Sequence, residues 1–151
     1  MALPTPVPGL VIRYAFLWRD EAARRREEAS KDRPCAIILV TEKKRSSRDE
    51  TPDVIVTVLP ITHTPPKDPK LAVEIPSATK LRLGLDDARS WIVVTDANQF
   101  VWPGPDLRFE IGNDATSCSY GLLPRSVFNE VRDKFVAAAK AQRSRTVKRT
   151  R

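Results

Sequence analysis

Apolar residues along this chain come in short bursts, and most of these bursts alternate with polar residues. Residues 10–18 show the clearest alternation, with Ile12, Tyr14, Phe16 and Trp18 on one side. Alternation with a period of two predicts a β-strand that has one buried face. The same reasoning predicts further strands at residues 35–41, 53–61, 71–75, 90–95, 99–102 and 117–122.

Residues 35–41 differ from the other bursts because they are apolar from Cys35 to Val40 and rich in β-branched side chains. Such a run predicts a strand that is covered on both faces. About five to seven short strands with turn signals between them predict a small barrel or sandwich.

The last apolar pattern is helical. It begins after Pro124, a residue that fits the first turn of a helix. The apolar residues then recur at spacings of three and four, at Val127, Phe128, Val131, Phe135 and Ala138. These spacings place them on one stripe of an α-helix, so the stripe is expected to pack against the strands.

The net charge divides the chain into parts. The 151 residues include 26 lysines and arginines and 19 aspartates and glutamates, for a net charge of +7. Residues 140–151 hold six of the basic residues and no acidic one, which leaves 20 against 19, or +1, for residues 1–139. This division predicts a basic, disordered tail over residues 140–151. The prolines predict an arm over residues 1–8, which leaves a nearly neutral domain over residues 9–139.

Residue types that bind metals are scarce. Cys35, Cys118 and the single histidine, His63, do not have the spacing of a zinc site, and we expect neither a metal nor another cofactor. The first eight residues include three prolines, and no lysine or arginine precedes Arg13, unlike a secretory signal. The longest apolar run is far shorter than the about 20 residues that span a bilayer. We therefore expect a cytoplasmic protein that does not enter a membrane.

Several short motifs follow one another along the chain. Gly9 opens a Gly-x-hydrophobic-hydrophobic strand, and Arg33-Pro34 stands directly before the apolar strand that starts at Cys35. Residues 58–62 read Val-Leu-Pro-Ile-Thr, and residues 120–124, Tyr-Gly-Leu-Leu-Pro, lead into the terminal helix. In this order the motifs resemble the toxin family of bacterial toxin–antitoxin modules typified by MazF, Kid and PemK, over residues 9–139.

The resemblance implies a mainly β (α+β) fold, a small SH3-like β-barrel followed by a C-terminal α-helix. It also implies a growth-inhibiting toxin that works as a homodimer, with a groove for single-stranded RNA such as mRNA. The implied activity is a metal-independent endoribonuclease in which the 2′-hydroxyl of the RNA attacks the phosphate. The implied protein partner is a cognate antitoxin.

Arg33 matches the catalytic arginine of this family by its place in the Arg-Pro motif. A planar guanidinium can contact two phosphate oxygens, which suits the stabilisation of negative charge. A role in proton transfer is harder to accept, because the pKa of arginine lies above about 12. The alternative is a structural arginine that pairs with Asp32 or Glu28.

Thr62 matches the threonine at the end of a family strand, where its hydroxyl can donate to a phosphate oxygen. The alternative is a β-branched residue that only favours the strand. His63 departs from the family pattern. It is a candidate for acid–base work because a histidine can exchange protons near neutral pH. The alternative is that His63 is an exposed loop histidine without a role in catalysis. Adjacent residues of a strand face opposite sides, so Thr62 and His63 can share a groove only if the strand has ended.

Other features leave the function open. Asp86, Asp87 and Arg89 lie near the place of an Arg-x-Asp pair found in some family members, but in a different order, and we do not assign them that role. Trp91, Phe100 and Trp102 could stack on bases but are more typical of a core. A different class of protein is therefore also possible: an inactive barrel module of the same fold that binds RNA or a protein partner.

Overall fold

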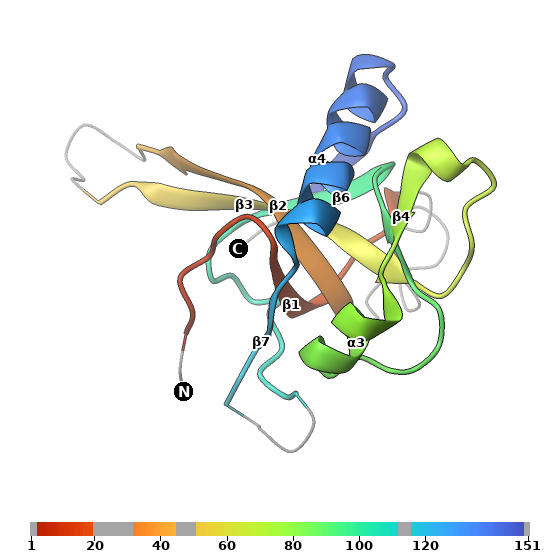
Figure 1. The fold of residues 1–151 in the computed structure, drawn as a ribbon. Helices are drawn as coiled ribbons and strands as arrows, with labels where there is room; N and C mark the ends of the chain where they lie inside the picture. Colours follow the sequence, from red (N-terminus) through yellow and green to blue (C-terminus); the bar gives the residue numbers. More distant parts are fainter. Residues whose placement is uncertain (1–2, 20–31, 45–50, 112–115, 150–151) are drawn as a thin grey trace.

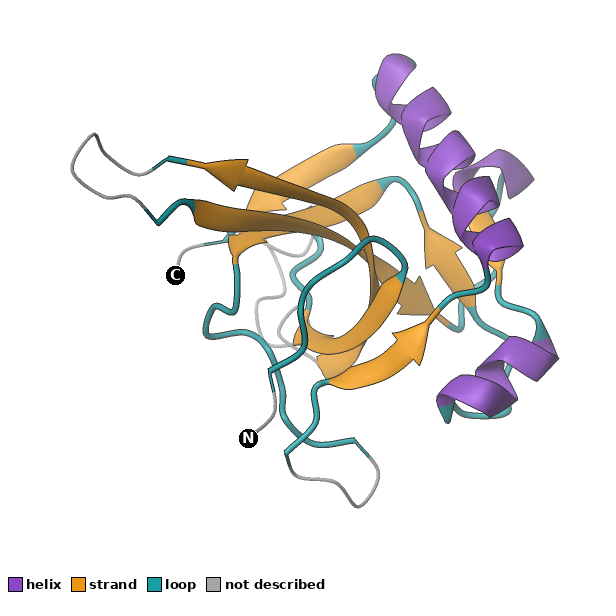
Figure 2. Ribbon diagram, turned by 60° about the vertical axis from the view of Figure 1, so that its left-hand side comes forward, coloured by secondary structure: helices purple, strands orange, loops and turns teal. Residues whose placement is uncertain are grey.

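The computed structural model describes residues 3–19, 32–44, 51–111 and 116–149. Within these ranges the chain forms eight β-strands, two α-helices and one 3-10 turn, so the fold is mainly β and of the α+β class (Figures 1 and 2). The charged segment that precedes Asp32, with Glu28 and the basic triplet at residues 24–26, lies outside the described residues.

All seven strands expected from the sequence are present, with shifted ends. The first ends at Ala15 rather than at residue 18, and the sixth begins at Asp96 rather than at residue 99. The strands are β1 (Leu10–Ala15), β2 (Asp32–Lys43), β3 (Asp53–Thr62), β4 (Ala72–Glu74), β5 (Trp91–Val93), β6 (Asp96–Val101), β7 (Ser119–Leu122) and an unexpected β8 (Arg145–Lys148).

The strands form one sheet in the order β4-β5-β3-β2-β1-β7, with β6 joined to β3 and β8 joined to β6. The pairs are antiparallel except for β6 and β8, which run parallel. The sheet divides at β3, because residues Ile55 to Val58 pair with β6 whereas Ile61 and Thr62 pair with β5. Over the described residues β4 and β7 remain the ends of the main path, and the sheet does not close into a barrel.

Two apolar clusters cover the two faces of the central strands. Val11, Ala36 and Leu59 belong to the cluster beneath the helices, whereas their neighbours Ile12, Cys35 and Val58 belong to the cluster on the other face. This alternation is the geometry of a pleated strand that is buried on both sides. The expectation for residues 35–41 is confirmed for Cys35 to Ile38 and is wrong from Leu39, which is 47% exposed where the β2–β3 hairpin projects away from the sheet (Figure 1).

Helix α4 (Arg125–Lys140) confirms the predicted terminal helix. Pro124 is its N-cap residue, and Val127, Val131 and Ala138 are its buried residues. They pack into the cluster beneath the helices together with Phe128 and Phe135, so the predicted stripe is the one that contacts the sheet. Figure 2 shows α4 lying against the strands. Neither α4 nor α3, the described helices, has the length and apolar character of a segment that crosses a bilayer.

Helix α3 (Ser77–Leu83) was not predicted from the sequence. Pro76 precedes it, and Gly84, with φ of +74°, ends it in the left-handed region that glycine adopts without strain. Leu83 is its only buried apolar side chain, so a helix of seven residues leaves no periodic apolar stripe in the sequence. The preceding 3-10 turn, η1 (Pro69–Leu71), begins at Asp68, whose carboxylate accepts from the backbone N–H of Lys70.

The expectation of a disordered tail over residues 140–151 is wrong for most of that segment. Residues Arg145 to Lys148 form β8, which pairs in parallel with β6. Arg149 then bonds to the carbonyl of Ala15 at 2.8 Å and forms an ion pair with Asp106 at 3.2 Å. The high content of basic residues suggested a solvated tail. However, among the described strands β8 pairs only with β6 and so lies at the edge of the sheet, where basic side chains can remain in contact with solvent.

Candidate functional site

The structure places Arg33 and Thr62 at the same end of two neighbouring strands. Arg33 lies near the start of β2 and Thr62 is the last residue of β3. The two strands are antiparallel, with Cys35 opposite Pro60 and Ala36 opposite Leu59. Continuing this register by two residues places Arg33 across from Thr62. Two residues that are distant in sequence therefore meet at one edge of the sheet.

Two neighbouring pockets open at this edge, and Arg33, Thr62 and Thr64 line both of them. We call the first, of about 500 Å³, the Trp18 pocket. We call the second, of about 510 Å³, the His63 pocket. The other residues of the Trp18 pocket are Trp18, Pro65, Pro66, Lys67, Asp68, Leu71, Ala72, Val93, Thr95 and Asp96. The other residues of the His63 pocket are Arg13, Asp32, Pro34, Ile61, His63, Gly84, Leu85, Asp86, Ser90 and Tyr120.

The guanidinium of Arg33 lies 5.2 Å from the centre of the Trp18 ring, in a cation–π contact. Its Nε is buried and has no hydrogen-bond partner within the described part of the chain. Asp32, one of the two partners considered from the sequence, instead contacts Arg13 at 3.9 Å and Arg108 at 3.2 Å. Within the described part of the chain Arg33 thus packs on an aromatic face and lines both pockets, where its guanidinium can contact an anion.

The hydroxyl of Thr62 lies at the turn that ends β3. Its Oγ1 accepts a hydrogen bond from the backbone N–H of Thr64 at 3.2 Å. A hydroxyl group that accepts one bond can still donate its own hydrogen. Thr62 can therefore present an O–H donor on the wall that the two pockets share, beside Arg33.

His63 is the first residue after β3, and it lines the same pocket as Thr62 because the strand has ended. Its Nε2 lies 2.7 Å from Oδ2 of Asp86, and the side chains of the two residues are 61% and 53% exposed. The structure thus brings together all three candidate residues, Arg33, Thr62 and His63, and adds a carboxylate partner to the histidine.

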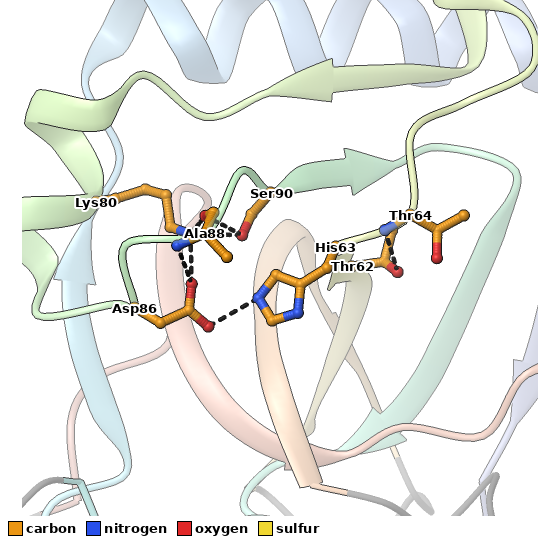
Figure 3. Close-up of polar contacts among 7 residues, drawn as sticks. All are labelled: Thr62, His63, Thr64, Lys80, Asp86, Ala88 and Ser90. Carbon is orange, nitrogen blue, oxygen red and sulfur yellow. Dashed lines mark hydrogen bonds and ion pairs between the residues drawn. The ribbon is translucent and has the colours of Figure 1, made fainter.

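Lys80 of α3 bonds to the carboxylate oxygen of Asp86 that does not face His63 (Figure 3). The Lys80 side chain is only 6% exposed, and its Nζ donates to Oδ1 of Asp86 at 2.7 Å, to Oγ of Ser90 at 2.6 Å and to the carbonyl of Ala88. The hydrogen bond from Lys80 is the main cause that lowers the pKa of Asp86; slight burial opposes it, and the bond from His63 adds to it. Asp86 is therefore ionised at neutral pH.

Tyr120 adds a neutral hydroxyl to the His63 pocket. Burial raises the pKa of Tyr120, and the charge of Arg13 opposes that shift only in part. The phenol consequently remains protonated near neutral pH, when it can donate a hydrogen bond to a ligand in the pocket.

Several of these residues were missed by reasoning from the sequence. Asp86 was noted but given no role, because its order relative to Arg89 differs from the family pattern. Arg89 instead forms two hydrogen bonds with Glu74. No sequence pattern indicated a role for Lys80, because the short helix α3 that contains it has no apolar periodicity. The alternation predicts that Trp18 is a strand residue on the same face as Phe16, but β1 ends at Ala15.

The other candidate groups are mostly part of the core. Trp91 and Phe100 are buried, which confirms the core interpretation for these two aromatic residues. Cys35 and Cys118 are also buried, and burial raises the pKa of both thiols. In the described ranges no three histidine, cysteine, aspartate or glutamate side chains gather in a metal-binding group.

Comparison with known proteins adds no relative. The chain matches no family model, no curated protein and no solved structure.

Proposed function

We propose that this protein is an endoribonuclease that cleaves single-stranded RNA without a metal ion, by attack of the ribose 2′-hydroxyl on the adjacent phosphate. The observation that carries the proposal is the placement of Arg33 and Thr62 side by side on the wall between two pockets. A phosphate seated on that wall has one nucleotide on each side, and each of the two neighbouring pockets can hold one of them. Pocket volumes near 500 Å³ fall within the range of about 300–1,000 Å³ typical of small-ligand sites.

The residues divide the chemistry between them. The guanidinium of Arg33 stabilises the negative charge that builds up on the phosphate oxygens, and the hydroxyl of Thr62 donates a further hydrogen bond there. His63 takes the proton of the 2′-hydroxyl as the 2′-oxygen bonds to phosphorus. The bond from phosphorus to the 5′-oxygen then breaks, and the leaving oxygen takes a proton from water, which reaches this exposed edge. The products are a 2′,3′-cyclic phosphate and a free 5′-hydroxyl.

The remaining parts of the proposal depend on the resemblance of the motifs to the MazF/PemK toxin family. They are an SH3-like fold of the strands, a homodimer as the working unit, mRNA as the target and a small antitoxin as the partner. The motif residues support this proposal by their positions: Arg33 and Thr62 occupy one edge, and residues 120–124 cover the end of β7 and lead into α4.

The Arg33→Ala substitution tests the proposed activity. Purified protein is incubated with a single-stranded RNA oligonucleotide in the presence of a chelator, and the cleavage rate is measured. Removing one preorganised donor of this kind is expected to lower kcat by about 100- to 1,000-fold. The matched control is Arg125→Ala, an exposed arginine at the start of α4 that lines neither pocket, and its rate is expected to equal that of the wild type.

The same assay separates the nuclease from a binding module. Wild-type protein that binds the oligonucleotide but releases no cyclic phosphate under any ionic condition would support a module that binds RNA without cutting it. Equal rates for the wild type and Arg33→Ala would show that the site lies elsewhere.

A further inference from the structure

The two nitrogens of the His63 ring have different surroundings. Nε2 faces Oδ2 of Asp86 at 2.7 Å. The pKa of Asp86 is lowered, chiefly by the hydrogen bond from Lys80, so the carboxylate is ionised and can only accept. Nε2 must therefore carry the hydrogen of this bond. In the neutral ring this leaves the lone pair on Nδ1, on the other side of the ring.

Asp86 is itself fixed on the side away from His63. Its Oδ1 accepts from Nζ of Lys80 at 2.7 Å and from the backbone N–H of Ala88 at 3.2 Å. The ammonium of Lys80 is buried and has two further oxygen partners, one from Ser90 and one from the carbonyl of Ala88. A buried charge with three partners has little freedom to move, so one carboxylate oxygen is anchored while the other meets the imidazole (Figure 3).

We propose that Asp86 is a positioning residue for His63 and that Lys80 anchors it, so that Nε2 is fixed as the hydrogen-bond donor and Nδ1 is the base that accepts the 2′-hydroxyl proton. This inference rests on the proposed nuclease function and names the proton acceptor within it. Nδ1 gains the proton that the 2′-oxygen loses. The water that protonates the 5′-oxygen leaves a hydroxide, and the protonated ring later gives its proton to this hydroxide.

The spectroscopic test does not depend on activity. His63 is the only histidine, so nitrogen-15 labelling gives a single imidazole spectrum. A hydrogen bond to a carboxylate slows the exchange of a ring N–H with water, so in spectra recorded at low temperature we expect its cross-peak at Nε2 in the wild type. Asp86→Ala should lose the cross-peak. Asp87→Ala, which removes the neighbouring exposed carboxylate, should retain it.

The kinetic test asks whether the arrangement matters for cleavage. Asp86→Ala is expected to lower kcat by about 10- to 100-fold, as loss of a group that orients a reacting side chain does, with KM changed less than about twofold. Asp86→Glu should restore part of kcat because it restores the carboxylate. Lys80→Met, which leaves Asp86 without its anchor, should also lower kcat and weaken the cross-peak.

The outcomes separate this inference from the proposed function. A cross-peak that persists in Asp86→Ala, or an unchanged kcat in that variant, would overturn the positioning role. Thermal melts identify any variant that fails to fold; should Lys80→Met unfold, the Asp86 and Asp87 variants decide the question. A wild type that shows the Asp86-dependent cross-peak but cuts no RNA would contradict the nuclease and still support the assignment of the donor nitrogen.

Discussion

Arg33 and Asp32 are neighbours in sequence, but their side chains have different partners. Asp32 bonds to arginines from other segments, Arg13 and Arg108, whereas Arg33 packs on Trp18. The reason is the strand geometry of β2, in which adjacent side chains point to opposite faces. At the scale of single residues, two oppositely charged neighbours in a strand thus take different partners, because their side chains lie on different faces of the strand.

The two cysteines allow a test at this scale. Both are fully buried, and burial raises the pKa of each thiol, so neither forms the reactive thiolate at pH 8 in the folded state. We expect a thiol reagent to label neither residue in native protein and both residues in urea, as followed by absorbance. Rapid labelling of native protein would contradict the packing of β2 and of the segment before β7. A control peptide with one free cysteine calibrates the reagent.

At the scale of elements, the C-terminal strand is the largest departure from expectation. Arg149 follows β8 and inserts between β1 and β6, where it bonds to Ala15 and to Oδ1 of the buried Asn98. Asn98 in turn pairs with both backbone groups of Leu17, next to Trp18 of the pocket. The C-terminal segment is therefore connected through Asn98 to the wall on which Arg33 rests.

Arg149→Ala tests this connection. The substitution removes two hydrogen bonds, to Ala15 and to Asn98, and leaves the mostly buried Asp106 without its ion-pair partner. We expect the free energy of unfolding to fall by about 2–3 kcal/mol, as measured in urea. Lys148→Ala, an exposed neighbour on β8, should change it by less than about 0.5 kcal/mol. Equal effects of the two substitutions would contradict a stabilising role for the contacts of Arg149.

At the scale of the whole molecule, the structure changes the meaning of the +7 charge. Among the described residues of the C-terminal segment, two arginines lie next to residues that line the Trp18 pocket. Arg143 bonds to Asp68, and Arg145 lies opposite Asp96, and both of these aspartates line that pocket. The positive charge therefore lies beside the proposed path of the RNA.

Neutralising three exposed residues of this segment, Lys140, Arg145 and Lys148, to glutamine tests that placement. Each phosphate contact on a single strand contributes about 0.7 to the slope of log binding constant against log salt. We expect the slope to fall by up to about 2 in fluorescence-anisotropy titrations, with kcat at saturating RNA unchanged.

The matched control carries the same change of charge elsewhere, at Lys43, Arg125 and Arg132. These residues are exposed and line neither pocket. An equal change of slope in the two triple variants would show that the effect is one of total charge and not of position.

The sequence by itself determined the seven core strands and α4, because apolar periodicity records which face of an element is buried. It also identified Arg33, Thr62 and His63 as candidates, since each belongs to or adjoins a motif at a strand end. It could not identify β8 or α3, whose few buried side chains leave no periodic pattern.

Only the tertiary structure decided which groups meet. The β2–β3 register brings Arg33 opposite Thr62, and the end of β3 turns His63 into the same pocket. The loop after α3 then brings Asp86 to His63, and α3 itself supplies the buried lysine that pairs with Asp86. Such contacts join residues 6 to 29 positions apart in the chain, and no local pattern encodes them, because they arise from the packing of a helix and strands around a common core.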